Sequence, residues 1–424
     1  MYKKETLKNG LRIITHNMKQ RDSISIGFWV GVGGRYEEGN LKGGSHFLEH
    51  IVFKGSQKYT CEEIKDKVEG IGGTLNAFTS EEQTCFYAKI PSKHLKQTFD
   101  VLADMVFFPK ISGRDMTKEK TVILEEIKMY RDLPQHLVME LLDELVWPNH
   151  PLGRNLAGTP QTVSAMRPSD LKKFHQAHYT PKNIVIAVAG NVEHSEIVNL
   201  AQKKLKNQIS SEQQDYRKAG ILQSKPQINL YKKNIEQMHM ALGMPGFDEN
   251  HKDRYVLSLL SIILGGNMSS RLFVEVREKR GLAYSISSCT KSLHDTGMFM
   301  IRAGVDNKKI FDTIKLIFKE LSKIKRSCVS KKEFQLAKDY LFGQLMLGLE
   351  DTMEHMLWIG ETIISRDKIK TLAHVIKEFN KITLQDIQRV ACEVLDKNRF
   401  HLAIVGPLTE QQEHQINILF DTKS

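Results

Sequence analysis

The sequence is poor in cysteine and has no long apolar run. Only five of its 424 residues are cysteines, and none of them forms a C-x-x-C pair. This odd count and wide spacing are typical of reduced thiols, not of a disulfide framework. No stretch of 18 apolar residues occurs, so the sequence predicts no membrane-spanning helix. The opening residues MYKKETLKNG contain neither the apolar core of a signal peptide nor an Arg- and Ser-rich transit segment, so we expect neither.

Nucleic-acid and nucleotide motifs are absent too. The net charge of +11 could attract nucleic acid or an acidic membrane. However, the lysines are spread in pairs such as Lys203-Lys204 and Lys331-Lys332, which is typical of solvated helix faces and loops. No Walker loop occurs, and the glycines of residues 31–34 do not complete a dinucleotide-binding pattern. A nucleic-acid-binding protein therefore remains an alternative that rests on charge alone.

One short motif carries chemical information. His46-Phe47-Leu48-Glu49-His50 reads H-x-x-E-H, the inverted zinc-peptidase motif. On a helix, His46 and His50 lie one turn apart on one face, where two imidazoles can bind one metal ion. Glu49 lies beside them and could hold the attacking water without being a ligand. A catalytic zinc site needs this arrangement of ligands with an adjacent base.

A third ligand is expected from another helix. Residues 117–130 (TKEKTVILEEIKMY) have apolar residues at helical spacing. Glu126 lies on this segment, 76 residues after His50, and Glu119 lies two turns earlier on nearly the same face. Two carboxylates on one helix face are unfavourable unless a cation is nearby.

These motifs resemble the pitrilysin/insulinase family of inverted-motif zinc metallopeptidases. Within it, the chain is similar to the short members of the mitochondrial-processing-peptidase and bacterial processing-protease type. GGSHFLEHIVFKGS, GGTLNAFTSEEQTCFYAKI and MSSRLFVEVREKRGLAY carry the resemblance, which covers nearly the whole chain. It implies that His46, His50 and Glu126 are zinc ligands, Glu49 is the general base, and Glu119 is an acid near the metal.

The chain is predicted to be duplicated. Thr117-Lys118-Glu119 and Lys331-Lys332-Glu333 open similar segments 214 residues apart, and Asp170 and Asp386 precede similar strands at an offset of 216. The predicted fold is α+β: two homologous units, each a mostly antiparallel sheet covered by helices on one face. We expect a catalytic unit at residues 1–206, a linker at 207–226, and a unit without the metal motif at 227–424.

Two further segments are candidates for substrate binding. Residues 74–79 (TLNAFT) predict an exposed edge strand, which is either an ordinary blunted edge or a site where an extended peptide pairs. With the resemblance, Asn76, Ala77 and Thr79 become candidate substrate contacts. Arg277 and Tyr284, seven residues apart, resemble the family's arginine–tyrosine pair, which binds substrate and the developing oxyanion.

The resulting hypothesis is a zinc-dependent endopeptidase that hydrolyses unfolded peptides with a metal-activated water, one Zn²⁺ per chain. The alternative is a catalytically silent peptide-binding or scaffold subunit of the same family. The family encloses its substrate with four such units, so the resemblance implies a homodimer or a heterodimer with a related chain. Manganese or cobalt as the working metal stays open. The cysteines and the start of the chain favour a bacterial cytoplasmic location over the matrix of an organelle.

Overall fold

The chain folds into two compact units that each combine three stretches of sequence. The computed structural model describes residues 2–210, 215–220 and 225–420. The first unit comprises Met1–Ile127, Asn155–Arg217 and Leu345–Thr371, and the second comprises Lys128–Arg154, Lys218–Gln344 and Leu372–Ser424. The domain boundaries predicted from the sequence repeat, 1–206 and 227–424, stay a prediction. The compact units of the structure do not follow them as continuous stretches, because each unit includes segments from both halves of the sequence. Part of the predicted linker, residues 211–214 and 221–224, lies outside the described residues.

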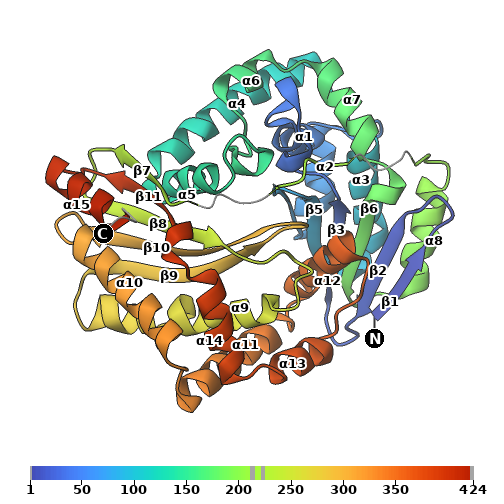
Figure 1. Cartoon of the computed structure of the whole chain (residues 1–424). Helices are drawn as coiled ribbons and strands as arrows, with labels where there is room; N and C mark the ends of the chain where they lie inside the picture. The colour runs from blue at the N-terminus through green and yellow to red at the C-terminus, as the bar shows by residue number, and fades with distance from the viewer. Residues whose placement is uncertain (1, 211–214, 221–224, 421–424) are drawn as a thin grey trace. The chain divides into compact units, whose positions relative to one another are not determined.

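The first unit is built on a mixed sheet. Its six described strands have the order β1-β2-β6-β3-β5-β4 (Figure 1). β2 and β6 are parallel, and the other neighbouring strands are antiparallel. The strands are β1 Tyr2–Thr6, β2 Arg12–Asn17, β3 Ser23–Val30, β4 Thr74–Thr79, β5 Thr84–Pro91 and β6 Ile184–Gly190. The predicted edge strand at 74–79 is confirmed as β4.

Helices cover both faces of this sheet. Alternate residues of β3 point in opposite directions. Phe28 packs toward Phe99 of α3 (Leu95–Phe107), with ring centroids 5.7 Å apart. Trp29 lies on the other face, in a cluster with α12 (Thr352–Arg366), which Figure 1 shows against the strands. A Cβ at Gly360 of α12 would lie 2.0 Å from Trp29 Nε1, so the close approach of helix and indole requires glycine there.

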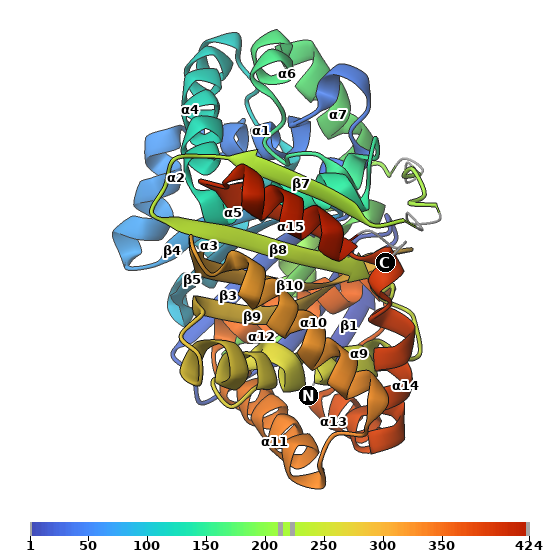
Figure 2. The same ribbon diagram turned by 60° about the vertical axis from the view of Figure 1, so that its left-hand side comes forward.

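The second unit repeats the topology of the first. Its described strands have the order β7-β11-β8-β10-β9. Figure 2 shows β7, β8, β10 and β9 in this sequence, and Figure 1 also labels β11. If β1 is set aside and the strands of each sheet are numbered along the chain, the two sheets have the same strand order. The strands of the second sheet are β7 Gln227–Lys232, β8 Gln237–Pro245, β9 Ala283–Ser292, β10 Gly297–Asp306 and β11 His401–Gly406. Asp170 and Asp386 each accept a backbone N–H at 3.0 Å in matching helix starts. The predicted α+β class with two homologous units is confirmed.

The covering of the sheets differs from the prediction in one respect. The predicted helices lay on one face only, but α12 covers the second face of the first sheet, and α5 (Pro134–Val146) packs on β8 and β11 of the second. Each of these helices lies in the half of the sequence opposite to its sheet. The second faces are apolar, as Val185 and Ala187 show for the first sheet, and burying them from water stabilises the fold.

The remaining helices surround the two sheets. In the first half of the sequence these are α1 Gly44–Val52, α2 Cys61–Val68, α4 Gly113–Asp132, α6 Pro160–Ala165, α7 Pro168–His178 and α8 His194–Leu205. In the second half they are α9 Arg254–Ser261, α10 Ile310–Arg326, α11 Lys331–Gly348, α13 Leu372–Asn380, α14 Leu384–Val394 and α15 Glu410–Phe420. Among the described residues, no helix has the length and apolar character that crossing a membrane requires.

Candidate metal centre

Helix α1 carries the H-x-x-E-H motif, and a buried carboxylate caps the N-terminus of this helix. Gly43 precedes the helix with φ of 90°, and a Cβ there would lie 2.6 Å from Ala157 O. Glu37 is only 3% exposed, and its carboxylate accepts the N–H groups of Gly43 and Ser45 at 2.7 Å each. A carboxylate at a helix N-terminus satisfies free N–H groups and complements the helix dipole. Sequence reasoning missed Glu37, whose only signal was an acid shortly before the glycine-rich helix start.

Three side chains converge at the centre of the motif. His46 Nε2 lies 3.6 Å and His50 Nε2 3.3 Å from Glu126 Oε2 on α4. Each residue offers one ligand atom, and the three atoms lie within 4.8 Å of one another. Donors at zinc–nitrogen and zinc–oxygen distances around a tetrahedral ion are separated by roughly 3.4 Å. The three residues therefore fit a zinc ion, and they are the only such group within the described residues.

The electrostatics of the two imidazoles differ. Burial, reinforced by His50, lowers the pKa of His46 to about 4, although Glu126 partly opposes this. Burial also acts to lower the pKa of His50, but the contacts with Glu126 and Glu119 outweigh it, so that pKa is raised. A metal ligand needs the neutral imidazole, so metal binding competes with protonation of His50.

Glu119 lies behind His50, outside the group of three donors. Its Oε2 is 3.1 Å from His50 Nδ1, and its Oε1 is 2.7 Å from Lys54 Nζ. Glu119 is only 4% exposed. A carboxylate that accepts the other ring N–H of a ligand histidine fixes its tautomer and ring orientation. The structure thus places Glu119 near the centre as predicted, with Lys54 as a partner that sequence reasoning missed.

Glu49 points to the edge strand. Thr79 Oγ1, at the end of β4, donates a hydrogen bond to Glu49 Oε2 at 2.6 Å. Burial raises the pKa of Glu49, although the bond from Thr79 acts in the opposite direction. Glu49 is absent from the group of three donors. Its role as general base stays a prediction. The Thr79 hydroxyl, expected to contact substrate, contacts Glu49 instead.

The other predicted contacts on β4 lie along its open edge. β4 pairs with β5, with Asn76 opposite Tyr87 and Ala77 opposite Phe86. It lies at one of the two edges of the sheet in the described chain, and β1 lies at the other. The Asn76 side-chain oxygen accepts the N–H of Ala77 at 2.8 Å. A peptide that pairs with β4 through this N–H has to displace the Asn76 side chain.

Arg277 and Tyr284 are brought together in the second unit. Arg277 lies in a π-helical turn, Phe273–Glu278, and Tyr284 is the second residue of β9. The Arg277 guanidinium carbon is 5.6 Å from the Tyr284 ring centroid and 4.7 Å from that of Phe273. Tyr284 is 72% exposed. The predicted pair thus exists as a neighbouring arginine and exposed phenol, and its role stays a prediction.

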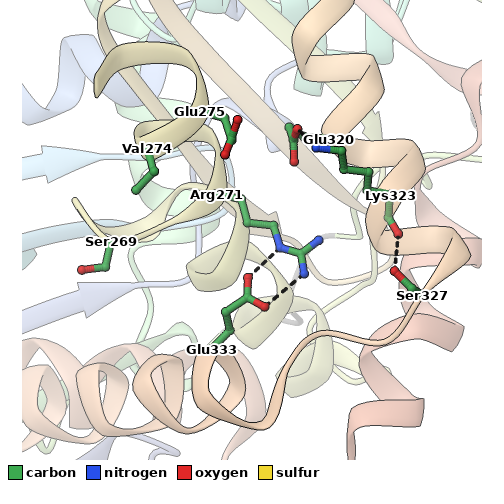
Figure 3. Close-up of a pocket in the computed structure, with 8 residues that line it drawn as sticks. All are labelled: Ser269, Arg271, Val274, Glu275, Glu320, Lys323, Ser327 and Glu333. Carbon is green, nitrogen blue, oxygen red and sulfur yellow. Dashed lines mark hydrogen bonds and ion pairs between the residues drawn. The ribbon is translucent and has the colours of Figure 1, made fainter. Parts of the chain in front are cut away.

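The position that corresponds to Glu119 in the second unit carries an ion pair. Glu333, 214 residues later, binds Arg271 through two bonds of 2.7 and 3.2 Å (Figure 3). The residue in place of Glu126 is Tyr340, which is 37% exposed. The repeat thus holds an arginine–carboxylate pair where the first unit holds the acid behind His50.

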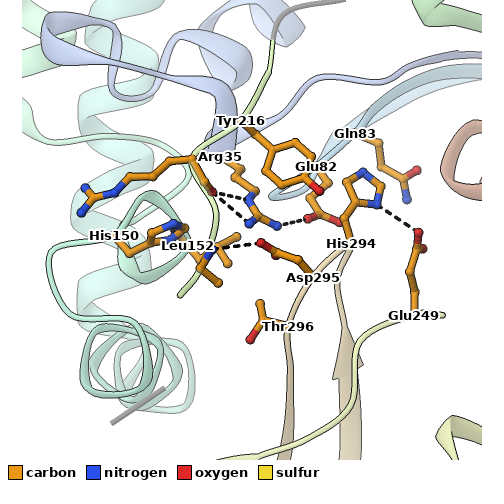
Figure 4. A network of polar contacts seen from close by, with 12 residues as sticks. Arg35, Glu82, Gln83, His150, Leu152, Tyr216, Glu249, His294, Asp295 and Thr296 are labelled. Atoms are coloured by element: carbon orange, nitrogen blue, oxygen red, sulfur yellow. Dashed lines mark hydrogen bonds and ion pairs between the residues drawn. The ribbon is translucent and has the colours of Figure 1, made fainter. Parts of the chain in front are cut away.

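A buried arginine anchors the segment that leads into the site. Figure 4 shows the Arg35 guanidinium beside Glu82 and Tyr216, and the Arg35–Glu82 contact is 2.5 Å. The guanidinium lies 4.0 Å from the centroid of the Tyr216 ring, and two of its nitrogens donate to Arg217 O. Arg35 is 1% exposed. This network ties the segment before Glu37 to the turn after β4, and no local sequence pattern predicts it.

Two family models match the chain. The model for "Insulinase (Peptidase family M16)" matches residues 12–160, and the model for "Peptidase M16 inactive domain" matches residues 165–341. The first match contains the candidate metal centre, and the second contains Arg277 and Tyr284.

Curated relatives match over nearly the full length. The chain is 37% identical over 411 residues to the "Uncharacterized zinc protease YmxG" of Bacillus subtilis (strain 168), covering 96% of this chain and 98% of the relative. It is 34% identical over 410 residues to an uncharacterized zinc protease of Mycobacterium leprae (strain TN), covering 96% and 92%.

Solved structures share the fold. A protease from Helicobacter pylori has a TM-score of 0.90 at 24% identity, covering 96% of this chain and 99% of that one. A Pseudomonas fluorescens structure, titled a peptidase M16 inactive domain, has a TM-score of 0.89 at 19% identity, covering 96% and 98%. At these identities the likeness supports the fold alone.

Proposed function

The chain belongs to peptidase family M16, the insulinase family, and on this premise we propose that it is a zinc-dependent endopeptidase of unfolded peptides. The observation that carries the proposal is the convergence of His46, His50 and Glu126 on one point. Glu49 lies beside them without joining them. Relatives over nearly the full length are named zinc proteases, which agrees with this chemistry.

The proposed mechanism assigns one task to each residue of the centre. His46, His50 and Glu126 would hold the zinc ion, with Glu119 fixing the His50 ring through its Nδ1. A bound zinc ion polarises the scissile carbonyl and lowers the pKa of the attacking water. Glu49 accepts the proton of that water on its carboxylate and later passes it to the leaving amine. The raised pKa of Glu49 suits a group that takes up and releases a proton.

The substrate is proposed to bind as an added strand. The outer edge of β4 offers backbone groups to an extended peptide, and Thr79 at its end hydrogen-bonds Glu49. This connection would place the peptide backbone next to the base. Because pairing uses the main chain, the site requires an extended and therefore unfolded segment, and it tolerates many side chains.

The second unit is proposed to assist in the transition state. Arg277 and Tyr284 lie near each other, and a guanidinium and a phenol can both donate to a developing oxyanion. In a two-fold dimer, each active site would combine the metal centre of one chain with this pair from the other. A silent scaffold subunit is not favoured, because the chain keeps His46, Glu49, His50 and Glu126.

A peptide mixture tests the proposal. The zinc-loaded chain is incubated with a mixed peptide library, with and without a chelator, and the products are identified by mass spectrometry. Internal cleavage that stops with the chelator and returns with added zinc is the expected result. A zinc-loaded chain that cuts no peptide, or cuts equally with the chelator, would contradict the proposal.

A further inference from the structure

A pocket in the second unit is lined mainly by charged and polar side chains (Figure 3). Its volume is about 390 Å³, which lies within the range of roughly 300–1,000 Å³ that small-molecule sites occupy. The lining residues that matter here are Arg271, Glu275, Glu320, Lys323 and Glu333, and all of them belong to the second unit. Neither the proposed mechanism nor the predicted arginine–tyrosine pair uses this pocket.

Two ion pairs in the pocket each leave one hydrogen-bonding atom over. Arg271 donates to Glu333 through Nε and Nη2, at 2.7 and 3.2 Å, so its third nitrogen, Nη1, bonds to none of the described residues (Figure 3). Glu320 binds Lys323 Nζ through Oε1 at 2.6 Å, and its Oε2 has no partner within the described chain. Both leftover atoms are open to solvent. The pocket therefore offers a donor on one side and an acceptor on another.

Glu320 is an unusual residue for its position on α10. It is only 3% exposed, and its helix neighbours Ile317, Leu321 and Ile324 are buried and apolar. A buried carboxylate is unfavourable unless its oxygens are hydrogen-bonded. Its partner Lys323 has a side chain that is 49% exposed, and an ion pair of this kind contributes little to stability. A carboxylate with one oxygen left over in a pocket is better explained by a ligand that completes it.

The other carboxylates of the pocket already have their partners. Glu275 binds Lys279 at 2.7 Å and Arg280 at 2.6 Å, and these two cations lower the pKa of Glu275 to about 2. Glu333 accepts the two bonds from Arg271 and, at the start of α11, the N–H of Ser330 at 3.1 Å. Glu320 is thus the carboxylate that remains for a ligand. On the other side, Arg271 Nη1 and the remaining hydrogens of the Lys323 ammonium are available as donors.

This pattern fits a ligand that carries both charges. A ligand carboxylate can accept from Arg271 and Lys323, and a ligand ammonium can donate to Glu320 Oε2. A simple anion would also meet the charge of Glu320, and a simple cation would meet those of Arg271 and Lys323, so each would combine one attraction with one repulsion. We propose that the pocket binds a small zwitterion, either a free α-amino acid or a dipeptide. The inference goes beyond the proposed peptidase function and does not depend on it.

Ligands with one end blocked test the charge pattern. Alanine and Ala-Ala are each compared with their N-acetyl and amide derivatives by calorimetry on the zinc-loaded Glu49→Gln chain, in which no ligand is hydrolysed. The unblocked form of the preferred ligand should bind saturably. Blocking either end should weaken binding by about ten-fold or more, which is the contribution of a hydrogen bond to a charged group. Equal affinity for the unblocked and amide forms indicates a cation site, equal affinity for the unblocked and acetyl forms indicates an anion site, and either result overturns the proposal.

Two pocket variants assign each end of the ligand to its partner. Glu320→Gln should remove the penalty for acetylation and keep the penalty for amidation. Lys323→Gln should reduce the penalty for amidation and keep the penalty for acetylation. The control is Asp312→Asn/Lys319→Gln, which neutralises two exposed side chains of α10 that do not line the pocket and should keep both penalties. A misfolded chain would lose both penalties together, so it cannot produce these opposite patterns.

Binding at another place gives a different result. If the unblocked ligands bind the two pocket variants as tightly as the control, they bind elsewhere, for example at the zinc ion, and the proposal is wrong. It is equally wrong if neither alanine nor Ala-Ala binds saturably at millimolar concentration, because the two ion pairs then serve only to hold α10 and α11 in place. Cleavage is not measured in this experiment, so these results leave the peptidase proposal as it stands.

Discussion

The hydrogen bond between Thr79 and Glu49 offers a sharp test of how the edge strand and the base cooperate. Thr79→Val removes the hydroxyl and keeps the β-branched shape of the side chain. The lost bond is 2.6 Å long and ends on a carboxylate. A hydrogen bond to a charged group contributes about 1.5–3 kcal/mol net. If the bond holds Glu49 in its productive orientation, its full loss corresponds to a decrease in kcat of roughly 10- to 150-fold.

The assay compares kcat, KM and zinc content in Thr79→Val, Thr79→Ser and Thr74→Val. Thr79→Ser keeps a hydroxyl in place and should retain most of the activity. Thr74 lies on the same strand with an exposed side chain, so Thr74→Val controls for the loss of a threonine hydroxyl from β4. Zinc content should stay unchanged in all three, because neither threonine belongs to the group of three donors. A Thr79→Val chain with the parent kcat would refute the role of this bond.

Three other predictions follow from the same geometry. Glu119→Gln should weaken zinc binding by roughly 10- to 100-fold, measured by competition with a chelating dye, because it alters the acceptor behind His50; unchanged affinity would contradict its role. If each active site is shared between the two chains of a two-fold dimer, mixing the inactive Glu49→Gln chain with the impaired Arg277→Ala chain under conditions that exchange subunits should restore about a quarter of the wild-type sites. No recovery of activity would contradict shared active sites. Burial, with a contribution from Arg399, lowers the pKa of His401 to about 4, so the unfolded chain binds the extra proton between pH 6.5 and 4. On going from pH 7 to pH 5, His401 should therefore decrease the free energy of unfolding by about 2 kcal/mol. In denaturant titrations, the His401→Leu variant should show a decrease that is smaller by this amount. An equal decrease in the parent chain and the variant would refute the prediction.

The candidate site was predictable from sequence where its geometry is local. His46 and His50 are one helical turn apart, so their common face follows from the spacing alone. Glu119 and Glu126 are two turns apart, which put both on the side of α4 that faces the histidines. The matching offsets of the repeat predicted a second sheet of the same topology, and its strand order agrees.

The parts that sequence could not give are long-range contacts. Lys54 and Thr79 reach the centre through Glu119 and Glu49, which lie 65 and 30 residues away in the sequence. The positions of α5 and α12 were missed for a different reason. Their apolar faces indicate that each helix is buried, but not which of two similar sheets it covers.

Zinc content and turnover of Glu49→Gln, measured together, test the central claim most directly. The substitution removes the base and leaves His46, His50 and Glu126 in place. The account predicts that the variant retains one zinc per chain and loses turnover by roughly 100-fold or more, the range of general-base catalysis. A Glu49→Gln chain with near-normal turnover, or one that no longer binds zinc, would contradict it.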